Sequence, residues 1–178
     1  MVNRAWKTSA IPGTAGRQAE TRASMSRTYK TRASAAGDAF RMSSFDTKIA
    51  VLLRDDLASW QRLNVTAFLV SGLAHVKPEL MGEPYEDADG TAYLPMFGQP
   101  VLVFSGTADV LTAAHGRALG RGLRLSIFTD ELFHTGNDVD NRAAVRAVPG
   151  EKLALAGLAL HGPKNAVDKI LKGASLHR

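Results

Sequence analysis

The chain of 178 residues contains no cysteine, and this absence limits its chemistry. Disulfide bridges, a thiolate nucleophile and zinc sites built on thiolates are all excluded. The sequence also lacks an apolar run of the ~18 residues that a membrane span needs, and no apolar signal core follows Met1. We therefore expect a cytoplasmic protein with no membrane partner.

Charge imbalance is nearly absent beyond the first 41 residues. The whole chain has 22 basic and 17 acidic residues, or +5, whereas residues 1–41 alone have eight basic and two acidic ones, or 8 − 2 = +6. The remaining 14 basic and 15 acidic residues sum to −1. A fold that binds nucleic acid usually carries a basic patch of its own. Nucleic acid is therefore an unlikely partner for the domain itself.

Residues 1–43 are predicted to form a disordered basic extension, because they are rich in Ser, Thr, Ala and Arg and poor in large apolar side chains. Three interpretations stay open. The segment could be an organelle transit peptide, a basic arm for nucleic acid, or the result of a start codon assigned too far upstream, with Met42 as the native start. The folded domain is predicted to span residues 44–178.

Short apolar runs alternate with segments of helical periodicity in the rest of the chain. The runs predict strands at 47–53, 100–104, 123–128 and 153–160, and the periodic segments predict helices at 60–75, 108–120, 138–148 and 163–171. Residues 82–99 are the least regular, and the Asp89-Gly90 pair within them favours a hairpin or excursion. The alternation predicts a three-layer α/β fold: a four-stranded mixed sheet, mostly parallel, with helices on both faces.

Several stretches resemble a known fold. KIAVLLRDDL, LNVTAFLVSGLAH, PVLVF, RLSIFTDE and LHGPKNAVDKILKG follow the order of the type 2 peptidyl-tRNA hydrolase fold. RDDLASWQRLNVTAFL, GEPYEDADGTAYLPMFGQPVLVF and GPKNAVDKILKGASLH more closely resemble a bacterial family of unknown function assigned to the same superfamily, domain of unknown function 2000. The resemblance covers about residues 44–177 and implies a peptidyl-tRNA hydrolase type 2-like fold.

The chain departs from the hydrolases where they carry their catalytic groups. The hydrolases have a lysine-rich loop before the first helix and a histidine on that helix. Here Arg62 is the only cation of the corresponding stretch, ASWQRL, and Phe68, Leu69 and Val70 occupy the helix positions. The hydrolase aspartate after the third strand corresponds to Asp130. The resemblance thus implies the fold more than the activity.

Polar residues follow the predicted strands, where ligands bind in open α/β sheets. We expect ligand-binding residues at the first strand end, on the first helix and on the last helix: Asp55, Asp56, Thr66 and Asn165. If the first and third strand ends share an edge, Asp55 or Asp56 could pair with Asp130, and one pKa would rise to give an acid and a base. The alternative is that Asp56 caps a helix and Asp130 lies in an exposed turn.

Two functions remain open from the sequence. In the first, the protein hydrolyses an ester or amide of a small acyl or aminoacyl compound, with Asp130 as base or orienter and Arg62 and Asn64 stabilising negative charge. In the second, it is a homodimeric domain without catalytic activity that binds a small ligand or has a regulatory role. No Gly-rich phosphate loop, Ser-His-Asp order or paired-histidine motif is present, so neither a cofactor nor a metal is expected.

Overall fold

The structure, a computed structural model, describes residues 45–177. The predicted extension, residues 1–43, lies outside the described residues. Seven strands and four helices follow one another along the described chain: β1 Thr47–Arg54, α1 Ser59–Val76, β2 Tyr85–Glu86, β3 Ala92–Tyr93, β4 Val101–Gly106, α2 Ala108–Leu119, β5 Leu125–Thr129, α3 Asp138–Arg146, β6 Leu155–Pro163, α4 Lys164–Ile170 and β7 Ser175–Leu176. Each predicted strand and helix forms, with bounds that differ by at most three residues.

The main sheet has five strands in the order β5-β6-β1-β4-β7. Only β1 and β4 run parallel, while β1–β6, β5–β6 and β4–β7 are antiparallel. The prediction of a four-stranded, mostly parallel sheet was therefore wrong in strand number and in direction. The mixed α/β class is correct.

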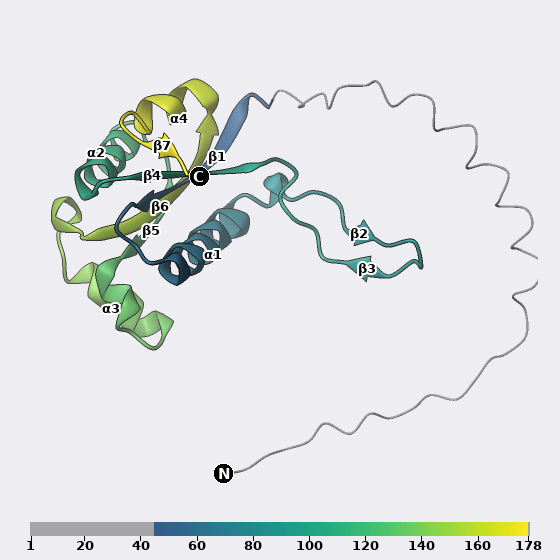
Figure 1. Ribbon diagram of the computed structural model, residues 1–178, viewed down its shortest axis with the longest axis horizontal. Helices are drawn as coiled ribbons and strands as arrows, with labels where there is room; N and C mark the ends of the chain where they lie inside the picture. The colour runs from purple at the N-terminus through teal and green to yellow at the C-terminus, as the bar shows by residue number, and fades with distance from the viewer. Residues whose placement is uncertain (1–44, 178) are drawn as a thin grey trace, which may run out of the picture. The chain divides into compact units, whose positions relative to one another are not determined.

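The connection between β5 and β6 explains the error in direction. A parallel pair needs a crossover whose helix packs on the sheet face, but α3 has no buried residue and stays at the edge where β5 ends. The backbone N–H of Asp130 donates to the carbonyl of Ala154 at 2.9 Å, which ties the end of β5 to the start of β6. The chain thus turns back at the same edge, and β6 runs antiparallel to β5 (Figure 1).

Helices cover both faces of the sheet, in agreement with the predicted layers. α1 packs on one face through Val65, Leu69 and Leu73, which recur every four residues and are buried. α2 and α4 pack on the other face around Leu111 and Ile170. No helix of residues 45–177 is both long and apolar enough to cross a membrane.

Gly157 of β6 sets how closely α1 approaches the sheet. A Cβ at this position would lie 2.8 Å from Cγ1 of Val65 and 3.2 Å from the backbone oxygen of Leu52. Both distances are below ordinary van der Waals contact, so only glycine lets the helix sit at this height. The position of the first turns of α1 depends on this contact.

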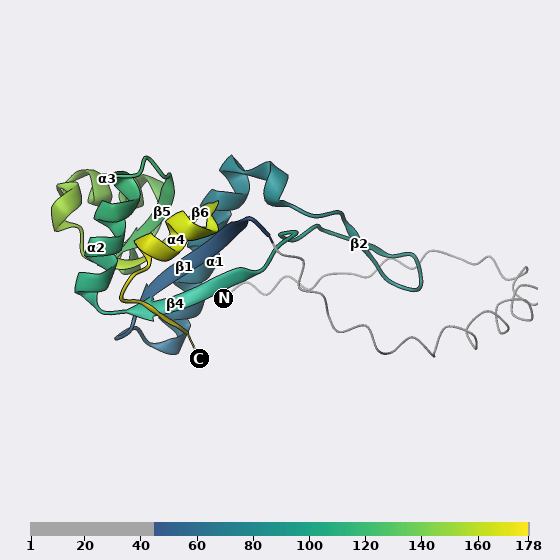
Figure 2. The same cartoon turned by 90° about the horizontal axis from the view of Figure 1, so that it is seen from above.

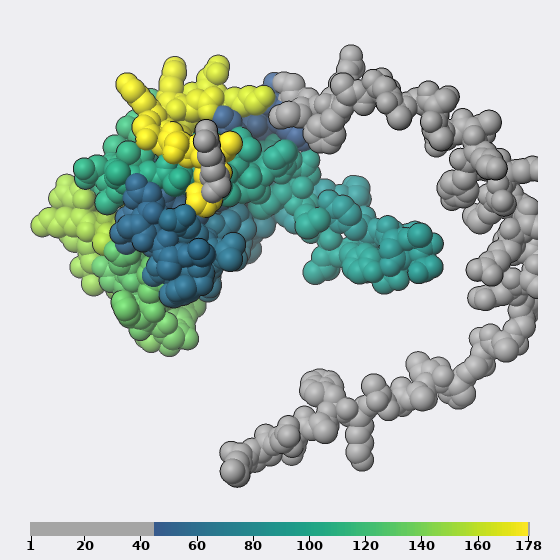
Figure 3. Space-filling view, in the orientation of Figure 1, coloured from purple at the N-terminus to yellow at the C-terminus, as the bar shows by residue number. Residues whose placement is uncertain are grey.

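The predicted hairpin forms, and it projects from the body. β2 and β3 pair antiparallel, Tyr85 with Tyr93 and Glu86 with Ala92, around a turn in which Gly90 has a φ of 81°. Figures 1, 2 and 3 show this segment reaching away from the sheet and its helices. We call residues 82–98 the arm.

Candidate functional site

Three strands end at one edge of the sheet. β1 and β4 are parallel, and β5 lies antiparallel to β6 and therefore runs with β1, so Arg54, Gly106 and Thr129 close their strands at this edge. We call it the carboxyl edge. The Gly162-Pro163 junction lies at the opposite edge, because Pro163 pairs with Thr47 at the start of β1.

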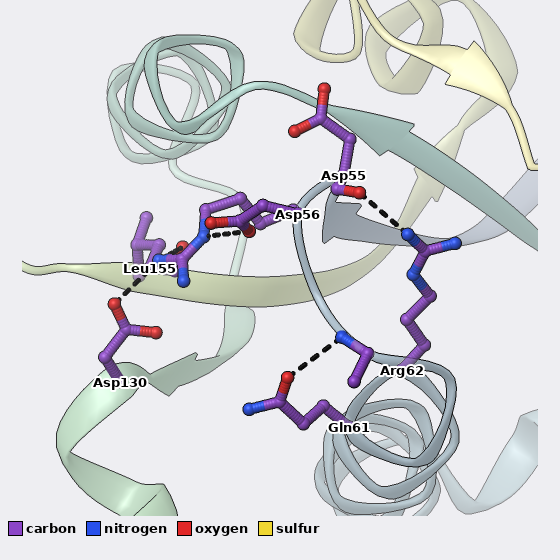
Figure 4. Close-up of polar contacts among 8 residues, drawn as sticks. Asp55, Asp56, Gln61, Arg62, Asp130 and Leu155 are labelled. Atoms are coloured by element: carbon purple, nitrogen blue, oxygen red, sulfur yellow. Dashed lines mark hydrogen bonds and ion pairs between the residues drawn. The ribbon is translucent and has the colours of Figure 1, made fainter.

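At the carboxyl edge, the carboxylates of Asp56 and Asp130, labelled in Figure 4, bind one guanidinium, that of Arg54. Its Nη1 donates to Oδ2 of Asp130 at 2.8 Å and to the carbonyl of Leu155 at 3.3 Å, and its Nε donates to Oδ1 of Asp56 at 2.6 Å. The hydrogen bond to Asp130 and the charge of both carboxylates raise the pKa of Arg54 above its ordinary value. We call Arg54, Asp56 and Asp130 the ion cluster.

The ion cluster separates the carboxylates that the sequence suggested as a pair. The guanidinium of Arg54 binds both Asp56 and Asp130, so the two carboxylates face the cation rather than one another. The side chain of Arg54 is only 15% exposed. Oδ1 of Asp56 and Oδ2 of Asp130 are thus already engaged in charge-assisted hydrogen bonds with Arg54. This arrangement stabilises the fold at the carboxyl edge.

Arg62 and Asp55 lie elsewhere, at a cavity of about 580 Å³ between α1, β4 and β7. Nη2 of Arg62 donates to the backbone carbonyl of Asp55 at 2.7 Å (Figure 4). Ser105, Ser175 and His177 line the same cavity. Arg62 therefore braces the loop between β1 and α1 and does not reach Asp130.

A larger cavity, about 810 Å³, opens between α1, the end of β5 and α3. We call it the aromatic pocket. Its lining combines aromatic and aliphatic side chains with a polar rim: Trp60, Asn64, Phe68, Ile127, Phe128, Leu132, Phe133, Thr135, Gly136, Asn137, Asp138, Asn141, Arg142, Val145 and Arg146. A volume of this size matches the cavities that hold small organic ligands, typically about 300–1,000 Å³.

Four aromatic rings form a continuous series in the pocket. The ring centroids of Trp60 and Phe133 are 5.8 Å apart, those of Phe133 and Phe128 are 5.0 Å apart, and those of Phe128 and Phe68 are 5.8 Å apart. The first and last pairs are edge-to-face, at 74° and 70°. Trp60 and Phe68, at the two ends, are 61% and 54% exposed, so a bound apolar group would remove large ring surfaces from water.

Some polar side chains of the rim already form hydrogen bonds or ion pairs with other protein groups, and others do not. The hydroxyl of Thr135 contacts the side chain of Asn141 and donates to the carbonyl of Leu132, and Arg142 pairs with Asp138 at 2.9 Å. Within residues 45–177, the side chains of Asn64 and Arg146 make no hydrogen bond or ion pair. An amide from α1 and a guanidinium from α3 therefore remain available to a ligand.

The remaining candidate residues make local contacts or lie far away. The hydroxyl of Thr66 donates to the carbonyl of Arg62 at 2.7 Å, one turn back on α1. Asn165 is exposed on α4, beside the opposite edge of the sheet. The structure thus distributes Asp130, Arg62 and Asn64 over the ion cluster, the smaller cavity and the aromatic pocket.

Sequence reasoning missed the aromatic members of the pocket. The chain has twelve residues of Phe, Tyr and Trp, and four of these meet here. The sequence did contain an indication, because large apolar residues also occur on the exposed side of α1, where polar residues are expected: Trp60, Leu63 and Phe68. The pairing of α1 with residues 127–133 is tertiary, however, and no local pattern encodes it.

Histidines of the described part do not form a metal site. No group of three or more His, Asp or Glu side chains within residues 45–177 is placed to hold an ion. Burial lowers the pKa of His115 on α2 and of His161 on β6, so both favour the neutral form. These two rings lie outside the aromatic pocket.

Comparisons with known proteins point to one family. Residues 47–178 match the family described as "Protein of unknown function (DUF2000)". A solved structure of a protein of unknown function, Atu0240 from Agrobacterium tumefaciens strain C58, is similar with 45% sequence identity and a TM-score of 0.74, over 76% of this chain and 100% of that chain. The comparison with curated proteins found no match.

Proposed function

Because the chain belongs to the DUF2000 family of proteins of unknown function, its role has to be inferred from its own site, and we propose that the domain binds a small ligand in the aromatic pocket without transforming it. The observation that carries this proposal is the series of four rings between α1 and α3, of which the two end rings are more than half exposed. A preformed apolar cavity with a few polar groups is the usual design of a small-molecule site.

The placement of the polar residues supports binding rather than catalysis. Hydrolysis of an ester or amide needs a base and an electrostatic stabiliser within hydrogen-bond reach of one reacting group. Asp130 is held by Arg54, and Arg62 is held by the carbonyl of Asp55, outside the pocket that contains Asn64. Within the pocket, the carboxylate of Asp138 pairs with Arg142 at 2.9 Å, so this possible base is engaged as well.

The lining also indicates a ligand class. A planar apolar body can pack against the exposed rings of Trp60 and Phe68, since edge-to-face and stacked contacts stabilise aromatic pairs by about 0.5–1.5 kcal/mol beyond their burial. A carboxylate on this body would accept charge-assisted hydrogen bonds from Arg146 and a further one from Asn64. We infer that the ligand is a small aromatic carboxylate.

Intrinsic fluorescence tests this proposal. Trp6 and Trp60 are the two tryptophans of the chain, so a Trp6→Phe variant leaves Trp60 as a single reporter inside the pocket. Titration with a panel of aromatic carboxylates is expected to change its emission saturably. Phe68→Ala should weaken binding about tenfold, which corresponds to ~1.4 kcal/mol, whereas Leu119→Ala, an equally exposed apolar residue on α2, should leave it unchanged.

Two results would contradict the proposal. If no member of the panel binds, or if Phe68→Ala and Leu119→Ala behave alike, the aromatic pocket is not the site. If the protein instead converts ester or amide analogues of the panel, the hydrolase interpretation is favoured, and Asp130→Asn should then abolish turnover. Binding without turnover supports the proposal.

We infer descent from the type 2 peptidyl-tRNA hydrolase superfamily with loss of its lysine-rich loop and helix histidine, and a cytoplasmic location. An assay of the purified chain on peptidyl-tRNA is expected to show no hydrolysis, and cell fractionation checks the location.

A further inference from the structure

We propose that the arm of one copy lies across α1 of a second copy and covers the open side of its aromatic pocket, so that a symmetric dimer completes the site. The pocket closure rests on the proposed function, whereas the dimer itself does not. The arm supplies an apolar, acidic surface, and the face of α1 with the C-terminal half of α3 supplies an apolar, basic one.

The arm is built as a defined element. Oδ1 of Asp87 accepts hydrogen bonds from the backbone N–H of Asp89 at 3.0 Å and of Thr91 at 2.9 Å, and its Oδ2 accepts one from the hydroxyl of Tyr93 at 2.7 Å. At the base, the N–H of Gly82 donates to the carbonyl of Met96 at 2.8 Å. The hydrogen bond from Tyr93 is the main reason that the pKa of Asp87 lies below its ordinary value, so the carboxylate form is favoured in the turn.

The arm nevertheless has no core of its own. Two-stranded hairpins are marginal in water unless they pack on something else. Tyr85 and Tyr93 are about half exposed, Met96 is 60% exposed and Leu94 is 86% exposed. These four large side chains lie within twelve residues of the chain, and Figures 2 and 3 show the arm standing clear of the body that could otherwise cover them. An apolar projection of this kind is typical of a protein contact.

A matching surface lies on the same chain, beyond the arm's own reach. Trp60, Leu63 and Phe68 on α1 are 61%, 75% and 54% exposed, and two of them, Trp60 and Phe68, line the aromatic pocket. The arm leaves the body just after the C-terminal end of α1, is held at its base by the Met81–Phe97 bridge, and points away from its own helix. A second copy can present its α1 to the arm.

Charge supports a second copy as the occupant. Residues 82–99 contain four acidic residues and no basic one, whereas residues 42–81 and 100–178 contain 14 basic and 11 acidic residues, or +3. On α3, Arg146 makes no ion pair within residues 45–177 and lines the pocket beside α1. The acidic arm of one copy is thus complementary in charge to the C-terminal half of α3 of the next, where Arg142 and Arg146 lie at the pocket.

The dimensions agree with a reciprocal contact. Each leg of the arm has about eight residues and spans about 26 Å at ~3.3 Å per residue. α1 has 18 residues, which at ~1.5 Å per residue is about 27 Å. A twofold axis that places two α1 helices antiparallel would let each arm run along the partner's helix, with the same patch used twice.

Cysteine cross-linking tests the geometry, because the chain has no native cysteine. A Leu94→Cys, Leu63→Cys double variant is expected to form disulfide-linked dimers on mild oxidation. The matched control, Leu94→Cys with Leu119→Cys, pairs the arm with a leucine on α2 that is also more than half exposed, and it should cross-link at least tenfold more slowly. All three leucines are more than half exposed, so the variants retain the core. Equal cross-linking in both variants would overturn the proposal.

Light scattering after size exclusion tests the dimer without any ligand. The full chain is expected to run as a dimer at micromolar concentration, and Leu94→Asp should weaken the dimer at least tenfold, whereas Leu119→Asp should not. A monomeric full chain, or equal effects of the two variants, would refute the arm contact while leaving the aromatic pocket untouched. If the dimer forms but ligand affinity is the same in wild type and Leu94→Asp, the arm dimerises without closing the pocket, and that part of the proposal fails.

Discussion

The ion cluster and the aromatic pocket both use the segment that follows β5, since Asp130 belongs to the cluster and Phe133 lines the pocket, yet they are built on opposite principles. In the ion cluster, one guanidinium binds two carboxylates and a carbonyl, and every strong charge has its partner inside the fold. In the aromatic pocket, the rings of Trp60 and Phe68 are half in water, and Asn64 and Arg146 have no partner within residues 45–177. Charged groups that are paired within the protein stabilise the fold, whereas exposed rings and polar side chains without a protein partner are available to a ligand.

The positions of charged residues in the sequence do not locate the candidate site. Strong charges at strand ends attract attention in a sequence, but they pair readily with one another when the edge is assembled. The aromatic rings at the surface contact one another but still leave much of their area exposed to water. The charged residues that follow the strands thus stabilise the fold, whereas the aromatic residues form the candidate site.

The largest expected effect breaks both regions together. Gly157→Ala forces a Cβ within 2.8 Å of Val65 and displaces α1, which supplies Trp60 and Phe68 to the aromatic pocket and begins three residues after Asp56 of the ion cluster. We expect a loss of about 2–3 kcal/mol in the free energy of unfolding, measured by urea denaturation. Gly116→Ala on α2, where no atom lies within 4 Å of the added Cβ, is the control and should be neutral or stabilising by up to ~1 kcal/mol. Equal losses would contradict the packing argument.

Removal of Arg54 should break the ion cluster alone. Arg54→Ala leaves two carboxylates and the carbonyl of Leu155 without their donor, and we expect a loss of about 2 kcal/mol in unfolding free energy. Arg54→Lys keeps the charge but not the planar fork, so it should lose about half as much. The emission of Trp60 in the folded state should stay unchanged in both variants. A shifted emission would mean that the two regions are coupled.

Asp130→Asn sharpens the contrast further. The carboxylate is 41% exposed, so solvent screens its pair with Arg54 and the loss of unfolding free energy should be about 1 kcal/mol. Affinity for an aromatic carboxylate should change less than twofold, because Asp130 does not line the pocket. A tenfold change, measured by the same fluorescence titration, would place Asp130 in the functional site after all.

The smallest effect is a pH dependence that belongs to neither region. Burial lowers the pKa of His115 and His161 below the ordinary value of 6.5, so the unfolded chain binds protons more readily than the folded one. Stability is therefore complete above pH 6.5 and declines as the pH falls below it. A His115→Gln, His161→Gln variant should show a shallower decline between pH 7 and 5 in thermal unfolding. An unchanged slope would exclude these rings as its cause.

Much of the local structure could be predicted from the sequence. The apolar run of β1, the four-residue recurrence of Val65, Leu69 and Leu73, and the Asp89-Gly90 turn each depend on neighbours within a few positions, and each appears where expected. The direction of β6 could not be predicted in this way. It depends on α3 remaining at the carboxyl edge with no buried residue, a property of the assembled sheet.

The sequence by itself determined the α/β class, the order of strands and helices and the projecting hairpin, because periodicity and turn residues act locally. Tertiary structure alone decided strand direction, the fifth strand β7, and which candidates meet. Arg54 binds Asp130 across 76 positions of the chain, and Trp60 meets Phe133 only because Gly157 lets α1 settle on β6. Contacts at such separations follow from packing the whole sheet, and no short segment contains them.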